Sequence, residues 1–273
     1  MSGAFTVNLA NVPMADPGYD DWAGSFFVRG ANGSFTPNGA TVVWADLVNP
    51  VSGTMSLSRR SEVMYSSPTW SGFQFQSAWG EDDFWAVALQ YAGEFSGFRV
   101  AGKIGYTDMS DPQFGCETEG GGVTVVGVDT FVNVANTDCQ MWAMSGSIMH
   151  VPTGLYVSAS YGELHDDLRQ ASLGAGFDDE DSNWYIQAGI ENKWHSWGKT
   201  TLYGEYGEQE NGTFDVDIHG KTISAWGLGV VQTVDAAAMD LYLAYRNFEA
   251  HTDIVTGPVD DIHLVGIGAL IKF

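Results

Sequence analysis

The stretch "WAVALQYAGEF" (residues 85–95) places an apolar side chain at almost every second position. In an extended strand, successive side chains point to opposite faces. One face would carry Trp85, Val87, Leu89, Tyr91 and Phe95. The other would carry Ala86, Ala88, Gln90, Ala92 and Glu94. The first face suits hydrocarbon or a dry core, whereas water is expected at the second.

The same alternation recurs along the chain, at 98–107, 184–194 and 239–246 and in the final segment "VGIGALIKF" (265–273). A soluble β-sandwich that binds ligands or adheres to surfaces is the alternative, because it would produce similar stripes with the apolar side turned to its core. Two features favour a membrane instead. Aromatic residues such as Trp85, Trp184 and Trp194 end the apolar stripes, and charged residues keep to the polar positions, as in membrane-spanning barrels.

Composition agrees with this interpretation and excludes several classes of protein. The 273-residue chain is 44% hydrophobic, and its mean hydropathy is only −0.08. It has no run of about eighteen apolar residues that could form a transmembrane helix. A formal net charge of −23 argues against nucleic-acid binding and makes cations the expected small partners.

Short and mostly longer connections alternate between the predicted strands. Links such as "GEFSG" (93–97) and "VPTG" (151–154) are tight, whereas 108–138 and 163–182 are long. Transmembrane barrels show this asymmetry, with short turns at the periplasmic edge and long loops outside. The last strand would then finish at the periplasmic rim.

Eleven strands are predicted from residue 59 onward. Their ranges are 59–67, 72–80, 84–93, 97–107, 139–150, 154–163, 183–194, 199–208, 222–232, 239–249 and 262–273. Residues 4–10 ("AFTVNLA") supply a twelfth, and about fifty residues with poor alternation follow it. We therefore divide the chain into 1–58, a short strand with a long functional loop, and 59–273, the remaining strands of a single barrel domain.

Residues 59–106, which include "RRSEVMYSSPTWSGF", resemble the general porins of Gram-negative outer membranes, most closely the alphaproteobacterial branch. "WGKTTLYGEYG" (197–207) and the terminal Phe273 extend the likeness. The resemblance implies an all-β fold, an antiparallel transmembrane β-barrel of sixteen strands that assembles as a homotrimer. On that pattern 4–10 is the fifth strand, 11–58 is the constriction loop, and the first four strands have no counterpart. Either upstream sequence is absent or twelve strands close as a smaller barrel.

The resemblance also implies function and partners. The protein would be an outer-membrane porin, a water-filled channel for passive diffusion of small hydrophilic solutes and ions, or alternatively a substrate-selective channel. Its partners would be outer-membrane lipid and lipopolysaccharide, a homotrimer of the chain, and the barrel-assembly machinery, which reads Phe273. The start of the chain shows no signal peptide, so we expect a mature, engineered or truncated sequence.

Charged residues on the polar faces are the candidate pore residues. We expect basic wall residues to face acidic loop residues across the narrowest point and to create a transverse field there. The basic set is Arg60, Arg99, Lys103 and Arg246, and the acidic set is Asp16, Asp20, Asp21 and Asp46. Rim charges or loop-anchoring salt bridges are the alternative role for each. The acidic balance of the chain predicts a preference for cations.

Cys116 and Cys139 are the only cysteines, and their number and spacing match neither a zinc motif nor a CxxC redox motif. A loop disulfide and a pair of free thiols are both compatible with them.

None of the six histidines lies in a catalytic or metal-binding motif, so we expect no enzyme, no cofactor and no metal.

Overall fold

The structure is a computed structural model that describes residues 61–80, 83–110, 138–167, 180–210, 222–251 and 259–271. Within these ranges no helix is long and apolar enough to cross a membrane. Eleven strands and one short 3-10 helix, Asp235–Ala237, make up the described elements.

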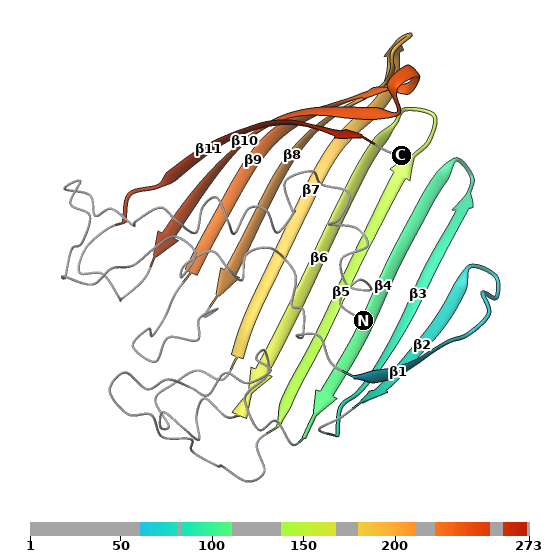
Figure 1. Cartoon of the computed structure of the whole chain (residues 1–273), viewed down its shortest axis with the longest axis vertical. Coiled ribbons are helices and arrows are strands. Elements are labelled where there is room, and N and C mark those ends of the chain that lie inside the picture. Colours follow the sequence, from blue (N-terminus) through green and yellow to red (C-terminus); the bar gives the residue numbers. More distant parts are fainter. Residues whose placement is uncertain are drawn as a thin grey trace.

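The strands are β1 (Glu62–Ser66), β2 (Phe73–Gly80), β3 (Trp85–Phe95), β4 (Phe98–Met109), β5 (Cys139–His150), β6 (Leu155–Asp166), β7 (Glu180–His195), β8 (Gly198–Glu210), β9 (Thr222–Val234), β10 (Met239–His251) and β11 (Ile262–Ile271). They form one sheet in chain order, and every neighbouring pair is antiparallel. Figure 1 shows the sheet curving from β1 to β11 as the wall of a barrel does.

The prediction of an antiparallel barrel wall is confirmed, because each of the eleven predicted ranges from residue 59 onward overlaps one strand. The boundaries differ most in β6 and β7, which run further toward the long connections than predicted. The reason is that main-chain pairing continues through the acidic ends of both strands, where the side-chain alternation is weak. The predicted strand 4–10 and loop 11–58 lie outside the described residues.

The tight turns gather at one edge of the sheet, as the alternation of connections predicted. Two of them are two-residue turns with positive φ at both positions. In Ser71–Gly72 the φ angles are 50° and 90°, and in Ser96–Gly97 they are 50° and 78°. Such turns match the right-handed twist of the strands they join. The opposite edge holds the short link between β2 and β3 and the longer connections.

The number of strands limits how this sheet can close. Because neighbours alternate in direction, β1 and β11 run the same way. A fully antiparallel barrel therefore requires an odd number of further strands between these two edges. Twelve and sixteen strands both satisfy that condition.

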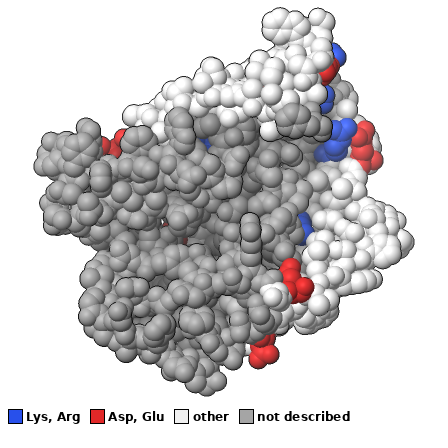
Figure 2. Space-filling view, viewed as in Figure 1, with Lys and Arg blue, Asp and Glu red and all other residues white. Residues whose placement is uncertain are grey.

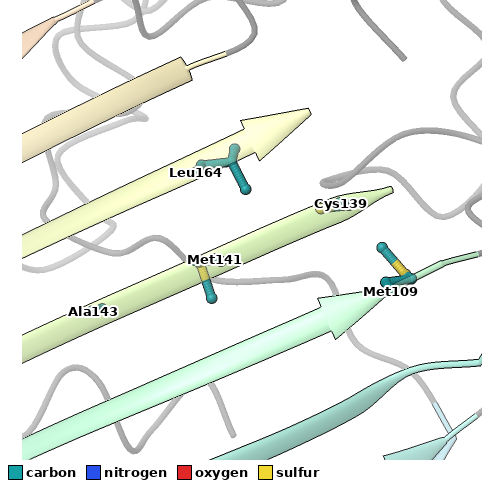
Figure 3. Packing of buried hydrophobic residues seen from close by; sticks show 5 residues of the cluster. All are labelled: Met109, Cys139, Met141, Ala143 and Leu164. Carbon is teal, nitrogen blue, oxygen red and sulfur yellow. The ribbon is translucent and has the colours of Figure 1, made fainter. Parts of the chain in front are cut away.

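The two faces of the sheet differ in burial, and part of the inner face is apolar and buried from solvent. Near the long connections the inner side chains of β4, β5 and β6 pack as an apolar cluster (Figure 3), consisting of Met109, Cys139, Met141, Ala143 and Leu164. Ala86 and Ala88 on β3 are also buried, at 1% and 3% exposure. The expectation that water covers this whole face is therefore wrong at the long-connection end.

Candidate functional site

The outer face of the sheet exposes a continuous set of large apolar side chains. Members from β2 to β11 in order are Phe75, Leu89, Ile104, Met144, Leu155, Ile186, Leu202, Leu228, Leu243 and Ile267, each at least 40% exposed. In Figure 2 few of the visible described residues are Lys, Arg, Asp or Glu. An apolar surface of this extent is far larger than the patches that soluble monomers expose, so it marks a contact with lipid or protein.

A repeated aromatic pair borders this surface at the long-connection end. In each of four strand pairs a tryptophan packs diagonally on a tyrosine of the next strand, with ring centroids 5.0 to 5.3 Å apart. The pairs are Trp85–Tyr106, Trp142–Tyr161, Trp184–Tyr206 and Trp226–Tyr245. Indole and phenol rings are enriched at this level of membrane barrels, where one end of the side chain meets water.

The hydroxyl groups of three of these tyrosines donate to carboxylates, and that of Tyr245 lies 2.8 Å from His263 Nδ1. Tyr106 donates a hydrogen bond to Asp108 at 3.0 Å, Tyr161 to Glu163 at 2.9 Å, and Tyr206 to Glu208 at 3.2 Å. In each case the acceptor lies two residues further along the same strand and therefore on the same face. The apolar surface thus ends abruptly in a row of carboxylates.

Aromatic residues also border the surface at the short-turn end. Phe73 packs on Tyr91 with centroids 4.7 Å apart, and Phe98 packs on the His150 ring at 4.9 Å. On β3, Trp85 and Phe95 mark the two borders and are separated by ten residues in unbroken register. At about 3.3 Å per residue and a strand tilt of about 40°, ten residues span about 25 Å along the membrane normal. That height equals the apolar band of outer-membrane barrels.

The inner face carries polar side chains where the outer face carries apolar ones. On β4, Lys103 is 7% exposed and donates to Gln76 Oε1 on β2 at 2.6 Å. In the row that contains Lys103, Gln90 donates to Gln74 Oε1, and Gln74 donates to the Ser67 carbonyl oxygen at 2.9 Å. These bonds link side chains across three strands on the inner face.

A second polar network covers the inner face of β6 to β10. Arg246 on β10 forms an ion pair through Nε with Glu205 Oε1 on β8. Tyr185 donates to the other carboxylate oxygen of Glu205 at 2.5 Å, and Gln187 donates to the Tyr185 oxygen at 3.3 Å. Tyr156 completes the network with a hydrogen bond to Gln187. The arrangement fixes one carboxylate and one guanidinium in the wall.

The structure places the described basic candidates on the inner face but gives each a separate partner. Arg99 lies next to the turn between β3 and β4 and pairs with Glu94 at 3.3 Å, with 58% and 53% of the two side chains exposed. Lys103 contacts a glutamine, and Arg246 contacts Glu205. Their role at a constriction stays a prediction. Arg60 and the acidic set, Asp16, Asp20, Asp21 and Asp46, lie outside the described residues, as does Phe273.

Cys139 is 2% exposed at the first residue of β5 and is disulfide-bonded. Cys116 lies outside the described residues, so its pairing with Cys139 stays a prediction.

One group of side chains in the described ranges could hold a cation, namely Glu163, His165 and Glu180 at the outer edge of β6 and β7. Its Glu163 carboxylate already accepts from Tyr161 and contacts His165 at 2.8 Å. Hydrogen bonds therefore account for the positions of Glu163 and His165 without an ion.

Glu205 and Tyr185 were not among the predicted site residues. Acidic residues were assigned mainly to loops, and nothing in the sequence connects position 205 with position 246. The signal that could have found Glu205 is its polar position within "TLYGEYG" (201–207), where a charge inside an alternating strand must face inward.

No protein-family model and no curated protein matches the chain. Among solved structures, the chain is similar to outer-membrane expressed OmpT of Vibrio cholerae, with 13% identity and a TM-score of 0.45 over 77% of this chain and 63% of that one. It is also similar to the trimer form of in-vitro folded OmpT of Vibrio cholerae, with 17% identity and a TM-score of 0.44 over 77% of this chain and 63% of that one. A third similar structure is a BenF-like porin from Pseudomonas fluorescens Pf-5, with 13% identity and a TM-score of 0.43 over 77% of this chain and 58% of that one. The chain spans about three fifths of the length of these structures.

Proposed function

We propose that the chain forms the wall of a water-filled channel in the outer membrane of a Gram-negative bacterium, through which small hydrophilic solutes and ions diffuse passively. The observation that carries the proposal is the pairing of an apolar outer band about 25 Å high with polar networks on the opposite face of the same strands. A polar lumen lowers the barrier to polar solutes by replacing hydrocarbon with water and hydrogen-bonding groups.

The exposed apolar residues distinguish this proposal from a soluble β-sandwich. In a sandwich the apolar side of each strand is covered by the other sheet. Here Leu89 and Leu243 are 44% and 48% exposed, although they lie in the middle of the outer face. Lipid is the partner that covers such a surface at every strand.

Reconstitution of the purified protein into planar lipid bilayers tests the proposal. Stepwise conductance increments proportional to salt concentration are expected, because ions would move through a wide aqueous path. A protein that stays monodisperse in buffer without detergent and gives no current would refute it.

Finer features of the proposal rest on sequence and resemblance. We propose a homotrimer, by the resemblance to porins, and a preference for cations, because the net charge is −23. A reversal potential in a salt gradient tests the preference, and an anion-selective potential would contradict it. We also propose that the protein is not an enzyme, which a screen for esterase and protease activity would test.

A further inference from the structure

We propose that Glu205 is a determinant of ion selectivity, because it forms a salt bridge with Arg246 in the wall, and that Gly227 is the positioning residue that allows this bridge. The inference rests on the proposed channel function. It concerns three residues on three neighbouring strands, of which only Arg246 was a predicted site residue.

The bridge crosses a strand. Glu205 on β8 pairs with Gly227 on β9, and Gly227 pairs with Arg246 on β10. The two charged residues therefore stand two strands apart, about 10 Å between their backbones. Their side chains meet by extending over the intervening position from both sides.

Glycine at position 227 leaves the space that this contact occupies. A Cβ atom there would lie 2.6 Å from Glu205 Oε1 and 2.9 Å from Arg246 Cγ, closer than real Cβ contacts. It would also lie 2.9 Å from the Tyr245 carbonyl oxygen, which the main chain holds in place. An alanine would thus push the carboxylate and the guanidinium apart.

The carboxylate is held on its other side as well. Tyr185 donates to Glu205 Oε2 at 2.5 Å, and the Glu205 side chain is only 3% exposed. Arg246 is 12% exposed. Charges this well shielded from water are screened less than exposed ones, so the loss of either charge changes the potential of the wall more strongly.

The chain supplies a matched control in the Glu94–Arg99 pair. It has the same chemistry and lies on the same face, but 53% and 58% of its side chains are exposed. Water and salt screen such a pair strongly. Its substitution should therefore change selectivity much less.

Reversal potentials in planar bilayers test the assignment of charge. Glu205→Gln should lower the cation-to-anion permeability ratio by about two-fold at 0.1 M salt, because it removes one negative charge from the wall. Arg246→Gln should raise the ratio by a similar factor, and the double variant should return near the original value. Glu94→Gln should shift the ratio less than Glu205→Gln. Equal shifts for Glu94→Gln and Glu205→Gln, or an unchanged ratio in Glu205→Gln channels that still conduct, would overturn the proposal.

The positioning role of Gly227 has a readout that needs no current. Phenylglyoxal modifies accessible arginines, and peptide mass mapping measures the rate at Arg246. Gly227→Ala and Glu205→Gln should both raise that rate several-fold. Gly204→Ala serves as the control, since a Cβ there meets Leu228 Cδ2 at 3.3 Å and leaves the bridge untouched. Folded Gly227→Ala protein with an unchanged rate at Arg246 would refute the positioning role.

The two experiments separate the possible failures. Absence of current from every variant, with Arg246 protected as expected, would reject the channel function and leave the bridge intact. Normal currents whose selectivity ignores Glu205 would reject the inference alone. Heat-dependent electrophoretic mobility reports whether each variant is folded. If Gly227→Ala does not fold, the selectivity of Glu205→Gln channels and the phenylglyoxal rate at their Arg246 still test the role of Glu205.

Discussion

Leu89→Arg should destabilise the protein strongly in lipid, because the structure places this side chain near the middle of the apolar band. Leu89 lies four residues from Trp85 and six from Phe95, the aromatic residues that end β3. At about 2.5 Å of height per residue, these separations are about 10 and 15 Å, so Leu89 lies within about 3 Å of the midplane. An arginine at that depth costs about 2 to 4 kcal/mol, a change of about 30- to 900-fold in the folding equilibrium.

Equilibrium unfolding in guanidinium chloride, followed by tryptophan fluorescence in lipid vesicles, measures this free energy. Phe95→Arg is the control for depth, because Phe95 is 54% exposed at the border of the band and should cost about 0 to 1 kcal/mol. Equal costs at the two positions would refute the membrane placement of the outer face. A stable, water-soluble Leu89→Arg protein would refute it as well.

Three further predictions concern the turns, the aromatic border and the cysteines. Gly154→Ala should cost about 1 to 3 kcal/mol of unfolding free energy, since the φ of Gly154 is 72° and a Cβ would collide with the Glu191 main chain. Gly146→Ala should be tolerated, because the nearest atom to a Cβ there is 3.8 Å away. Thermal unfolding in detergent compares the two variants, and similar losses of stability would contradict the turn geometry. Tyr161→Phe should lower the unfolding free energy by about 0.5 to 1.5 kcal/mol, because it removes the hydrogen bond to Glu163, and it should leave the conductance unchanged. An altered single-channel current would place this residue in the conduction path instead. We expect a disulfide between Cys116 and Cys139, so reduction should add the mass of two hydrogens to the intact protein. Two titratable thiols before reduction would exclude this disulfide.

Much of the fold follows from local patterns. Alternation along β3 identifies the side chains that face outward, and the fixed period of two means that this assignment holds for the whole strand. Short serine-glycine segments such as Ser96–Gly97 identify hairpins, because only a few residue types adopt positive φ in a two-residue turn. Strand ends were less certain, since side-chain periodicity fades at β6 and β7 where main-chain pairing continues.

The candidate site was predicted less completely. Sequence pattern assigned Lys103 and Arg246 to the polar face, and the structure places them there. It did not identify Glu205 as the partner of Arg246, because these residues are separated by 41 positions and by an intervening strand. Nor did it predict the buried apolar cluster on the inner face of β4 to β6, since alternation reports which residues share a face and not what covers that face.

The sequence by itself determined the antiparallel strands, the order of tight and long connections, and the division of side chains between two faces, because each depends on neighbours in the chain. Only the tertiary structure decided which residues meet across strands. Register sets Gly227 between Glu205 and Arg246. Contacts of this kind arise from main-chain pairing between segments far apart in sequence, which no local pattern encodes.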